Sequence, residues 1–201
     1  MLDGVMRQMI DPVLGRWGRR LASQGWNADA MTLIGLGLGL AAAGLIAVGA
    51  PGWLALLPLL AGRIADGLDG AIARAGVASD FGGYLDIVAD FTFYGAVPFA
   101  FALRDPLVAV PAAFLLLSFY VNGASFLGYA VQAAKRGMET SGRGEKSLYF
   151  TAGLLEGTET ILFFAVICWQ PLWFGPLAWV FGTLCFVTVG ARVMLARRVF
   201  A

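Results

Sequence analysis

Residues 66–90 read DGLDGAIARAGVASDFGGYLDIVAD and place four carboxylates in an otherwise apolar, glycine-rich stretch. These carboxylates belong to Asp66, Asp69, Asp86 and Asp90. The first two are spaced i, i+3 and the last two i, i+4, so each pair lies on one face of an α-helix. The short segment 75–81 makes the two predicted helices antiparallel neighbours. We therefore expect all four carboxylates to face one another.

The composition around this stretch is that of a membrane protein. Of the 201 residues, 59% are hydrophobic and only 13% are charged, whereas about 25% are charged in soluble domains. The net charge of +1 offers no basic surplus for a nucleic acid. The sequence contains no histidine, which excludes His-based catalysis and His-ligated metals. Cys168 and Cys185 lie in apolar stretches, where free buried thiols are expected.

Apolar runs of about 20 residues, long enough to cross roughly 30 Å of hydrocarbon, occur six times. We expect an all-α fold, a bundle of six transmembrane helices forming one domain over 1–201. The predicted spans cover about 30–49, 53–73, 82–103, 107–134, 148–168 and 172–195. Before them, 4–22 carries an apolar stripe and several arginines, which predicts an amphipathic juxtamembrane helix lying on the membrane surface.

The distribution of basic residues predicts the orientation of this bundle. Six spans put both termini and the second and fourth loops on one side, and that side receives 13 of the 14 Lys and Arg residues. Only Arg104 falls on the opposite side. By the positive-inside rule, both termini are cytoplasmic. At about 1.5 Å per residue, Asp66 and Asp90 lie roughly 12 Å from the cytoplasmic ends of their helices, so the acidic site also faces the cytoplasm.

Charged residues inside membrane spans are costly and by default mark function. Four facing carboxylates repel one another unless they are countered, and the basic neighbours in this stretch are Arg63 and Arg74. Hard divalent cations suit a set of oxygen ligands, and two of them balance four carboxylates. Small residues on the acidic face, Gly70, Ala73 and Gly82, let a ligand approach the backbone or let helices pack closely.

The pattern Asp66-x2-Asp69-Gly70-x2-Ala73-Arg74-x7-Gly82-x3-Asp86-x3-Asp90 resembles the signature of the CDP-alcohol phosphotransferases, also called CDP-alcohol phosphatidyltransferases. Every fixed position is filled, although the spacer of seven residues before Gly82 has eight in many members. The likeness extends to the six spans and the N-terminal amphipathic helix, and it favours a bacterial inner-membrane branch of the family. It implies an integral enzyme of the bacterial inner membrane and a homodimer.

The resemblance also implies an activity and roles for individual residues. The reaction is transfer of a phosphatidyl group from a CDP-alcohol, commonly CDP-diacylglycerol, to an acceptor hydroxyl, with release of CMP. Two divalent cations are implied, Mg²⁺ or Mn²⁺, with Ca²⁺ as an inhibitory occupant. The implied metal ligands are Asp66, Asp69, Asp86 and Asp90, with Asp90 also the catalytic general base. The implied CDP pocket is formed by Asp69, Gly70, Ala73, Arg74 and Gly82.

The acceptor site is less defined, and its candidates are Arg143, Lys146, Glu156 and Glu159. The two basic residues suit an anionic acceptor, but the positive-inside rule alone explains them. The two glutamates lie at the expected depth of the aspartates, where they can bind a polyol, orient a water, or pair with Arg63 or Arg192. The acceptor alcohol stays open.

Two other functions fit intramembrane acids. A cation or proton-coupled transporter also uses them, but transporter sites lie near the midplane, at broken helices and between internal repeats. Here the acids lie near one membrane face on regular helical spacing, and the sequence has no repeat. An inactive scaffold requires loss of a ligand position, and all four aspartates are present. The enzyme is therefore the favoured function.

Overall fold

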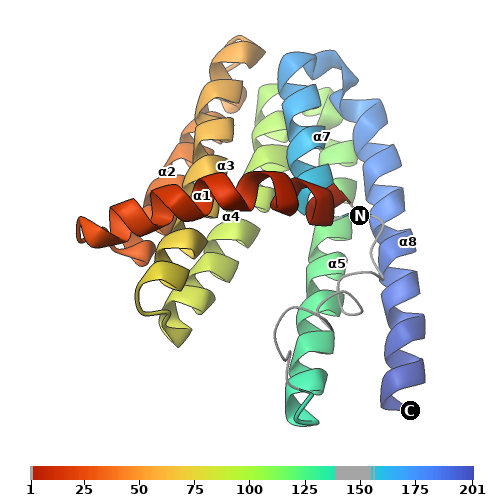
Figure 1. Ribbon diagram of the computed structural model, residues 1–201. Helices are drawn as coiled ribbons and strands as arrows, with labels where there is room; N and C mark the ends of the chain where they lie inside the picture. Colours follow the sequence, from red (N-terminus) through yellow and green to blue (C-terminus); the bar gives the residue numbers. More distant parts are fainter. Residues whose placement is uncertain (1, 139–154, 156) are drawn as a thin grey trace.

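The computed structural model describes residues 2–138, 155 and 157–201, and every regular element within these ranges is helical (Figure 1). This confirms the predicted all-α class. The elements in order are α1 (Leu2–Ser23), α2 (Ala28–Ala47), α3 (Gly52–Ala75), α4 (Asp80–Arg104), η1 (Pro106–Val108), α5 (Ala109–Lys135), α7 (Gly157–Trp169), η2 (Pro171–Trp173) and α8 (Phe174–Phe200).

The helices that carry the acidic residues begin at polar caps. The Asn27 side chain accepts a hydrogen bond from the Asp29 N–H at the start of α2. Ser79 Oγ accepts a 2.9 Å hydrogen bond from the Gly82 N–H at the start of α4. Such caps satisfy backbone donors that have no partner in the first helical turn. They fix where α2 and α4 begin relative to the end of α3.

The helices pack in two groups, α2 with α3 and α5 with α8, and α4 contacts both groups. Helix α2 packs along α3 and α4, α5 packs along α8, and α4 also contacts α5. Figure 1 shows α1 running across the other helices, and it contacts α3. Helices α2 and α3 approach most closely at Gly35 and Gly62, where a Cβ on Gly62 would lie 2.9 Å from the Gly35 carbonyl oxygen. The lack of a side chain at these two glycines therefore lets α2 and α3 pack closely.

The main apolar core is rich in aromatic side chains. Phe93, Phe164 and Phe174 are fully buried in it. The rings of Phe101 and Phe174 stack with centroids 4.2 Å apart, and Phe93 meets Phe164 edge-on. The two cysteines are free and buried in the same core, as expected from the sequence. This core holds α4 against α7 and α8.

Among the described residues, four helical stretches are long and apolar enough to cross a membrane: Ala28–Ala47, Asp80–Arg104, Pro106–Lys135 and Pro171–Phe200. They correspond to the first, third, fourth and sixth predicted spans. The second predicted span is α3, which carries four charged side chains between Arg63 and Arg74. The fifth was predicted over 148–168, of which the described part forms the short apolar helix α7. Length and composition thus identify an integral membrane protein without fixing six spans.

Candidate active site

Three of the four aspartates come together where α3 and α4 face each other. Asp66 and Asp69 lie on α3 and Asp86 lies on α4. Each offers a carboxylate oxygen, and these oxygens all lie within 4.8 Å of one another. Two oxygens on one Mg²⁺ or Ca²⁺ are at most about 4–5 Å apart, since the metal–oxygen distances are about 2.0–2.6 Å. The three carboxylates therefore fit a shared divalent cation.

Asp69 is the most deeply placed member of this cluster. It is buried, with 5% of its surface exposed, and its Oδ2 accepts a 2.6 Å hydrogen bond from the Thr32 hydroxyl of α2. A buried carboxylate needs such a donor because it has lost its water. Thr32 is itself buried. The hydrogen bond orients Asp69 toward the other two carboxylates.

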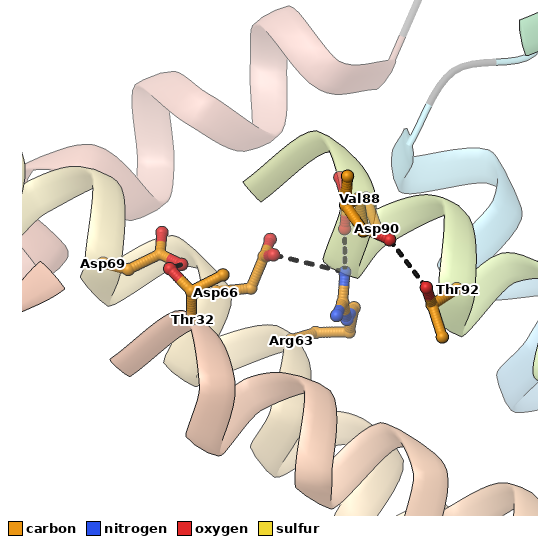
Figure 2. A network of polar contacts seen from close by, with 7 residues as sticks. All are labelled: Thr32, Arg63, Asp66, Asp69, Val88, Asp90 and Thr92. Atoms are coloured by element: carbon orange, nitrogen blue, oxygen red, sulfur yellow. Dashed lines mark hydrogen bonds and ion pairs between the residues drawn. The ribbon is translucent and has the colours of Figure 1, made fainter. Parts of the chain in front are cut away.

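Asp90 lies one helical turn beyond Asp86 and is held by Arg63 of α3. Arg63 Nη1 donates a 2.7 Å hydrogen bond to Asp90 Oδ1 and lies 3.5 Å from Asp66 Oδ1. Figure 2 shows the Arg63 guanidinium between these two carboxylates, with Asp69 and Thr32 on the far side of Asp66. The four aspartates thus share one site, in which Asp90 pairs with an arginine beside the cluster of three.

A cavity of about 440 Å³ opens on one side of the cluster, between the end of α3 and the starts of α2 and α4. Its lining includes all five residues that the sequence motif assigned to a nucleotide pocket: Asp69, Gly70, Ala73, Arg74 and Gly82. Arg74 is exposed at this cavity, where its guanidinium can contact a phosphate. The five motif residues therefore share one ligand-sized space.

Polar residues at the start of α2 and just before it also line this cavity. Asp29, Asn27 and Thr32 line it, opposite the glycines of α4. A Cβ on Gly82 would lie 2.9 Å from Asp29 Oδ1, so the absence of a side chain at Gly82 leaves space for Asp29. In the sequence, the polar residues near the start of α2 were the only indication that this helix contributes to the cavity. Their approach to α4 depends on helix packing, which the sequence does not show.

A second cavity of about 460 Å³ lies on the other side of the cluster and is lined from α4, α5, α7 and α8. Asp86 and Asp90 line it together with aromatic side chains such as Phe91 and Tyr94. Asp86 also lines the first cavity. Two ligands, one bound in each cavity, would therefore meet at the carboxylate cluster.

The basic residue of this second cavity is Arg192 of α8, for which the sequence indicated only a pairing with a glutamate. Its Nη1 donates to the Asn122 side-chain oxygen at 2.9 Å and to the Asn122 carbonyl oxygen at 3.1 Å. The same nitrogen contacts Ser125 Oγ. The guanidinium is thereby fixed against α5, on the wall that faces Asp86 and Asp90.

Of the predicted acceptor-site residues, Arg143, Lys146 and Glu156 lie outside the described residues. Glu159 lies in the first turn of α7 and is partly buried. Its neighbours Gly157 and Thr160 line the second cavity. The start of α7 therefore belongs to the wall of that cavity.

Comparisons with known proteins agree with this arrangement. The family model for CDP-alcohol phosphatidyltransferase matches residues 26–190. The chain is 43% identical over 196 residues to the inner membrane protein YnjF of Escherichia coli strain K12, covering 96% of this chain and 94% of that protein. It is similar in fold to the crystal structure of Mycobacterium tuberculosis phosphatidylinositol phosphate synthase (PgsA1) with CDP-DAG bound. The TM-score is 0.70, with 20% identity and coverage of 91% of this chain and 92% of the other.

Proposed function

The chain belongs to the CDP-alcohol phosphatidyltransferase family, whose members are divalent-metal-dependent transferases of phospholipid synthesis, and we propose its substrates and residue roles from this premise. The donor is CDP-diacylglycerol and the acceptor is a hydroxyl of a small polar alcohol. The reaction forms a new phosphodiester lipid and releases CMP. The observation that carries the proposal is the cluster of Asp66, Asp69 and Asp86 between two cavities, one of which contains the motif residues.

The cytidine and diphosphate of the donor bind in the first cavity. Gly70, Ala73 and Gly82 leave room for the ligand at the backbone, and Arg74 makes a charge-assisted contact to a phosphate. Asp29 and Asn27 supply further polar contacts at the end formed by α2. The cavity's position beside Asp69 and Asp86 supports this assignment because the diphosphate must reach the metal ligands.

The metal ligands are Asp66, Asp69 and Asp86, joined by Asp90 for a second ion. All the available ligand atoms are carboxylate oxygens, which fits Mg²⁺ or Mn²⁺, with Ca²⁺ as an inhibitory occupant. When bound, such ions neutralise the diphosphate and polarise the phosphorus for attack. Thr32 keeps Asp69 in position for this role through its 2.6 Å hydrogen bond.

Asp90 is the general base. It lines the second cavity, where it can accept the proton of an acceptor hydroxyl. The acceptor oxygen then forms a bond to the phosphatidyl phosphorus, while the bond from that phosphorus to the bridging oxygen of CMP breaks. CMP leaves through the first cavity. Asp86, which lines both cavities, lies where donor and acceptor meet.

The acceptor occupies the polar part of the second cavity, near Arg192 and Thr160. An arginine fixed by Asn122 and Ser125 favours an acceptor with an anionic or strongly hydrogen-bonding group. Glu159, at the start of α7, is a further candidate for acceptor binding, and the sequence candidates Arg143, Lys146 and Glu156 are kept in the proposal. The apolar lining from Phe91, Tyr94 and Phe119 suits the lipid portion of the product.

The chain acts as one domain of six spans, with α3 and the segment that contains α7 crossing the membrane beside the four apolar helices. Both termini and the active site face the cytoplasm, as the distribution of basic residues favours. Helix α1 lies at the membrane surface, where the exposed side chains of Ile10, Val13 and Trp17 contact lipid. A homodimer, usual in the family, is the proposed assembly.

The test uses purified protein with Mg²⁺ or Mn²⁺, labelled CDP-diacylglycerol and a panel of polyols and phosphorylated polyols. Metal-dependent CMP release that requires one acceptor supports the proposal and identifies the alcohol. Absence of CMP with every acceptor, together with metal-dependent ion uptake into liposomes, would instead show a transporter. An Asp80→Asn control keeps the acidic cluster intact, since Asp80 is exposed in the first turn of α4.

A further inference from the structure

Arg63 is unusual in the acidic site because it lies beneath the carboxylates that it contacts. Its side chain is 7% exposed, whereas the side chains of Asp66 and Asp90 are 29% and 31% exposed. Both contacts are made by the same atom, Nη1, at 3.5 Å and 2.7 Å. The guanidinium therefore reaches the two carboxylates from the protein interior, and their more exposed side stays open to a ligand.

An aromatic ring supports the guanidinium from the core. Arg63 Cζ lies 4.1 Å from the centroid of the Phe93 ring, which is fully buried and packed edge-on against Phe164. A cation over a buried ring is stabilised by the ring's negative face. Arg63 Nε is also buried, and it has no hydrogen-bond partner in the described part of the chain. The polar contacts of this arginine are therefore concentrated on Asp66 and Asp90.

A divalent cation at this site needs the same carboxylates. Asp66 belongs to the cluster of three that fits a shared ion, and Asp90 is the neighbouring aspartate on α4. Without a metal, the four negative charges are partly balanced by Arg63, which prevents strong mutual repulsion. With a metal bound, the guanidinium and the ion are like charges close together. The two cations then compete for the same carboxylates, and each weakens the contacts of the other.

We propose that Arg63 is an internal counter-cation that holds Asp66 and Asp90 in the metal-free protein and is released from at least one of them when a divalent cation binds. Arg63 is thus a positioning residue, and it acts through the carboxylates. The inference rests on the proposed function, since it assumes that the aspartates bind metal. It makes Arg63 a determinant of metal affinity and of the stability of the metal-free state.

The first experiment titrates Mn²⁺ into metal-free wild type and Arg63→Gln in detergent and measures free Mn²⁺ by electron paramagnetic resonance. The substitution removes the competing charge, so Mn²⁺ should bind roughly tenfold more tightly, which corresponds to ~1.4 kcal/mol. Thermal unfolding is measured with and without Mn²⁺. The midpoint should fall in the metal-free variant and return toward that of wild type in saturating Mn²⁺.

The matched control is Arg104→Gln, which removes an arginine that hydrogen-bonds the Ala50 carbonyl oxygen, away from the aspartates. It should leave Mn²⁺ affinity unchanged. A purely structural role for Arg63 predicts lower midpoints with and without metal and no gain in affinity, and that result would overturn the inference. Failure of wild type to bind Mn²⁺ at all would instead contradict the proposed function.

A second measurement uses wild type and does not depend on the folding of Arg63→Gln. In protein labelled with ¹⁵N-arginine, the Nε–H signal of Arg63 is assigned by its loss in Arg63→Lys. Addition of Mg²⁺ should shift this signal over the same concentration range that occupies the site, whereas the Arg104 signal stays in place. An Arg63 signal that is unchanged at saturating Mg²⁺ would refute the release of the guanidinium.

Discussion

The Thr32 hydroxyl and the Asp69 carboxylate form a 2.6 Å hydrogen bond between two buried side chains. Thr32 belongs to α2 and Asp69 to α3, so this contact joins the first turns of α2 to the acidic face of α3. It also gives a buried carboxylate the donor that burial makes necessary. The orientation of one proposed metal ligand therefore depends on a helix that contributes none of the four aspartates.

Thr32→Val removes this donor while keeping the shape of the side chain. We expect the metal-free protein to lose about 1–3 kcal/mol of unfolding free energy, because the buried carboxylate is left without its donor. Saturating Mn²⁺ should recover part of the loss by binding Asp69. Unfolding in detergent, with and without Mn²⁺, measures the loss and the recovery. In the control Thr183→Val, an exposed hydroxyl that donates to the Trp179 carbonyl oxygen is lost, and little change is expected. Equal effects of the two substitutions would contradict the role of Thr32.

Asp90→Asn keeps the size of the side chain but removes the proposed base. We expect transfer to be abolished while binding of CDP-diacylglycerol remains measurable, because the first cavity does not include Asp90. CMP release measures the reaction, and binding of labelled donor measures the complex. Asp80→Asn, at an exposed position of the same helix, should retain transfer. An Asp90→Asn enzyme with normal turnover would exclude Asp90 as the base.

Gly82→Ala tests the proposed nucleotide cavity. The new Cβ would lie 2.9 Å from Asp29 Oδ1 and 3.1 Å from Ser79 Oγ, so it would occupy space in the cavity and displace the Asp29 carboxylate. We expect KM for CDP-diacylglycerol to rise roughly tenfold, or ~1.4 kcal/mol, with the fold retained. Steady-state kinetics at saturating acceptor measures this change. Gly44→Ala is the control, since its Cβ meets no atom within 4 Å. The same KM in both variants would argue against donor binding there.

Arg192→Gln tests the second cavity as the acceptor site. Loss of a fixed guanidinium should raise KM for the acceptor by roughly tenfold or more, since hydrogen bonds to charged groups contribute about 1.5–3 kcal/mol. KM for CDP-diacylglycerol should change little, because Arg192 does not line the first cavity. Arg197→Gln, an exposed position on the same helix, is the matched control. A rise confined to the donor KM would contradict this assignment of the two cavities.

The local part of this site was predictable from the sequence. The spacing of Asp66 and Asp69, and of Asp86 and Asp90, places each pair on one helical face because helical geometry is a property of consecutive residues. The short connection at 75–81 keeps the start of α4 close to the end of α3, but α2, which packs along both helices, is what holds their acidic faces together. The motif residues Gly70, Ala73, Arg74 and Gly82 share the first cavity for the same reason. The sequence also determined the all-helical class, through its long apolar runs.

Tertiary structure alone decided which groups these aspartates meet. Thr32 reaches Asp69 across a helix interface, Arg63 pairs with Asp90 rather than with a glutamate of α7, and Arg192 joins the second cavity from the last helix. None of these contacts has a spacing in the sequence that could predict it. They depend on how α2, α4 and α8 pack against their neighbours. Contacts across helix interfaces follow from the fit of many side chains at once, whereas the periodicity of one helix is set by its own backbone.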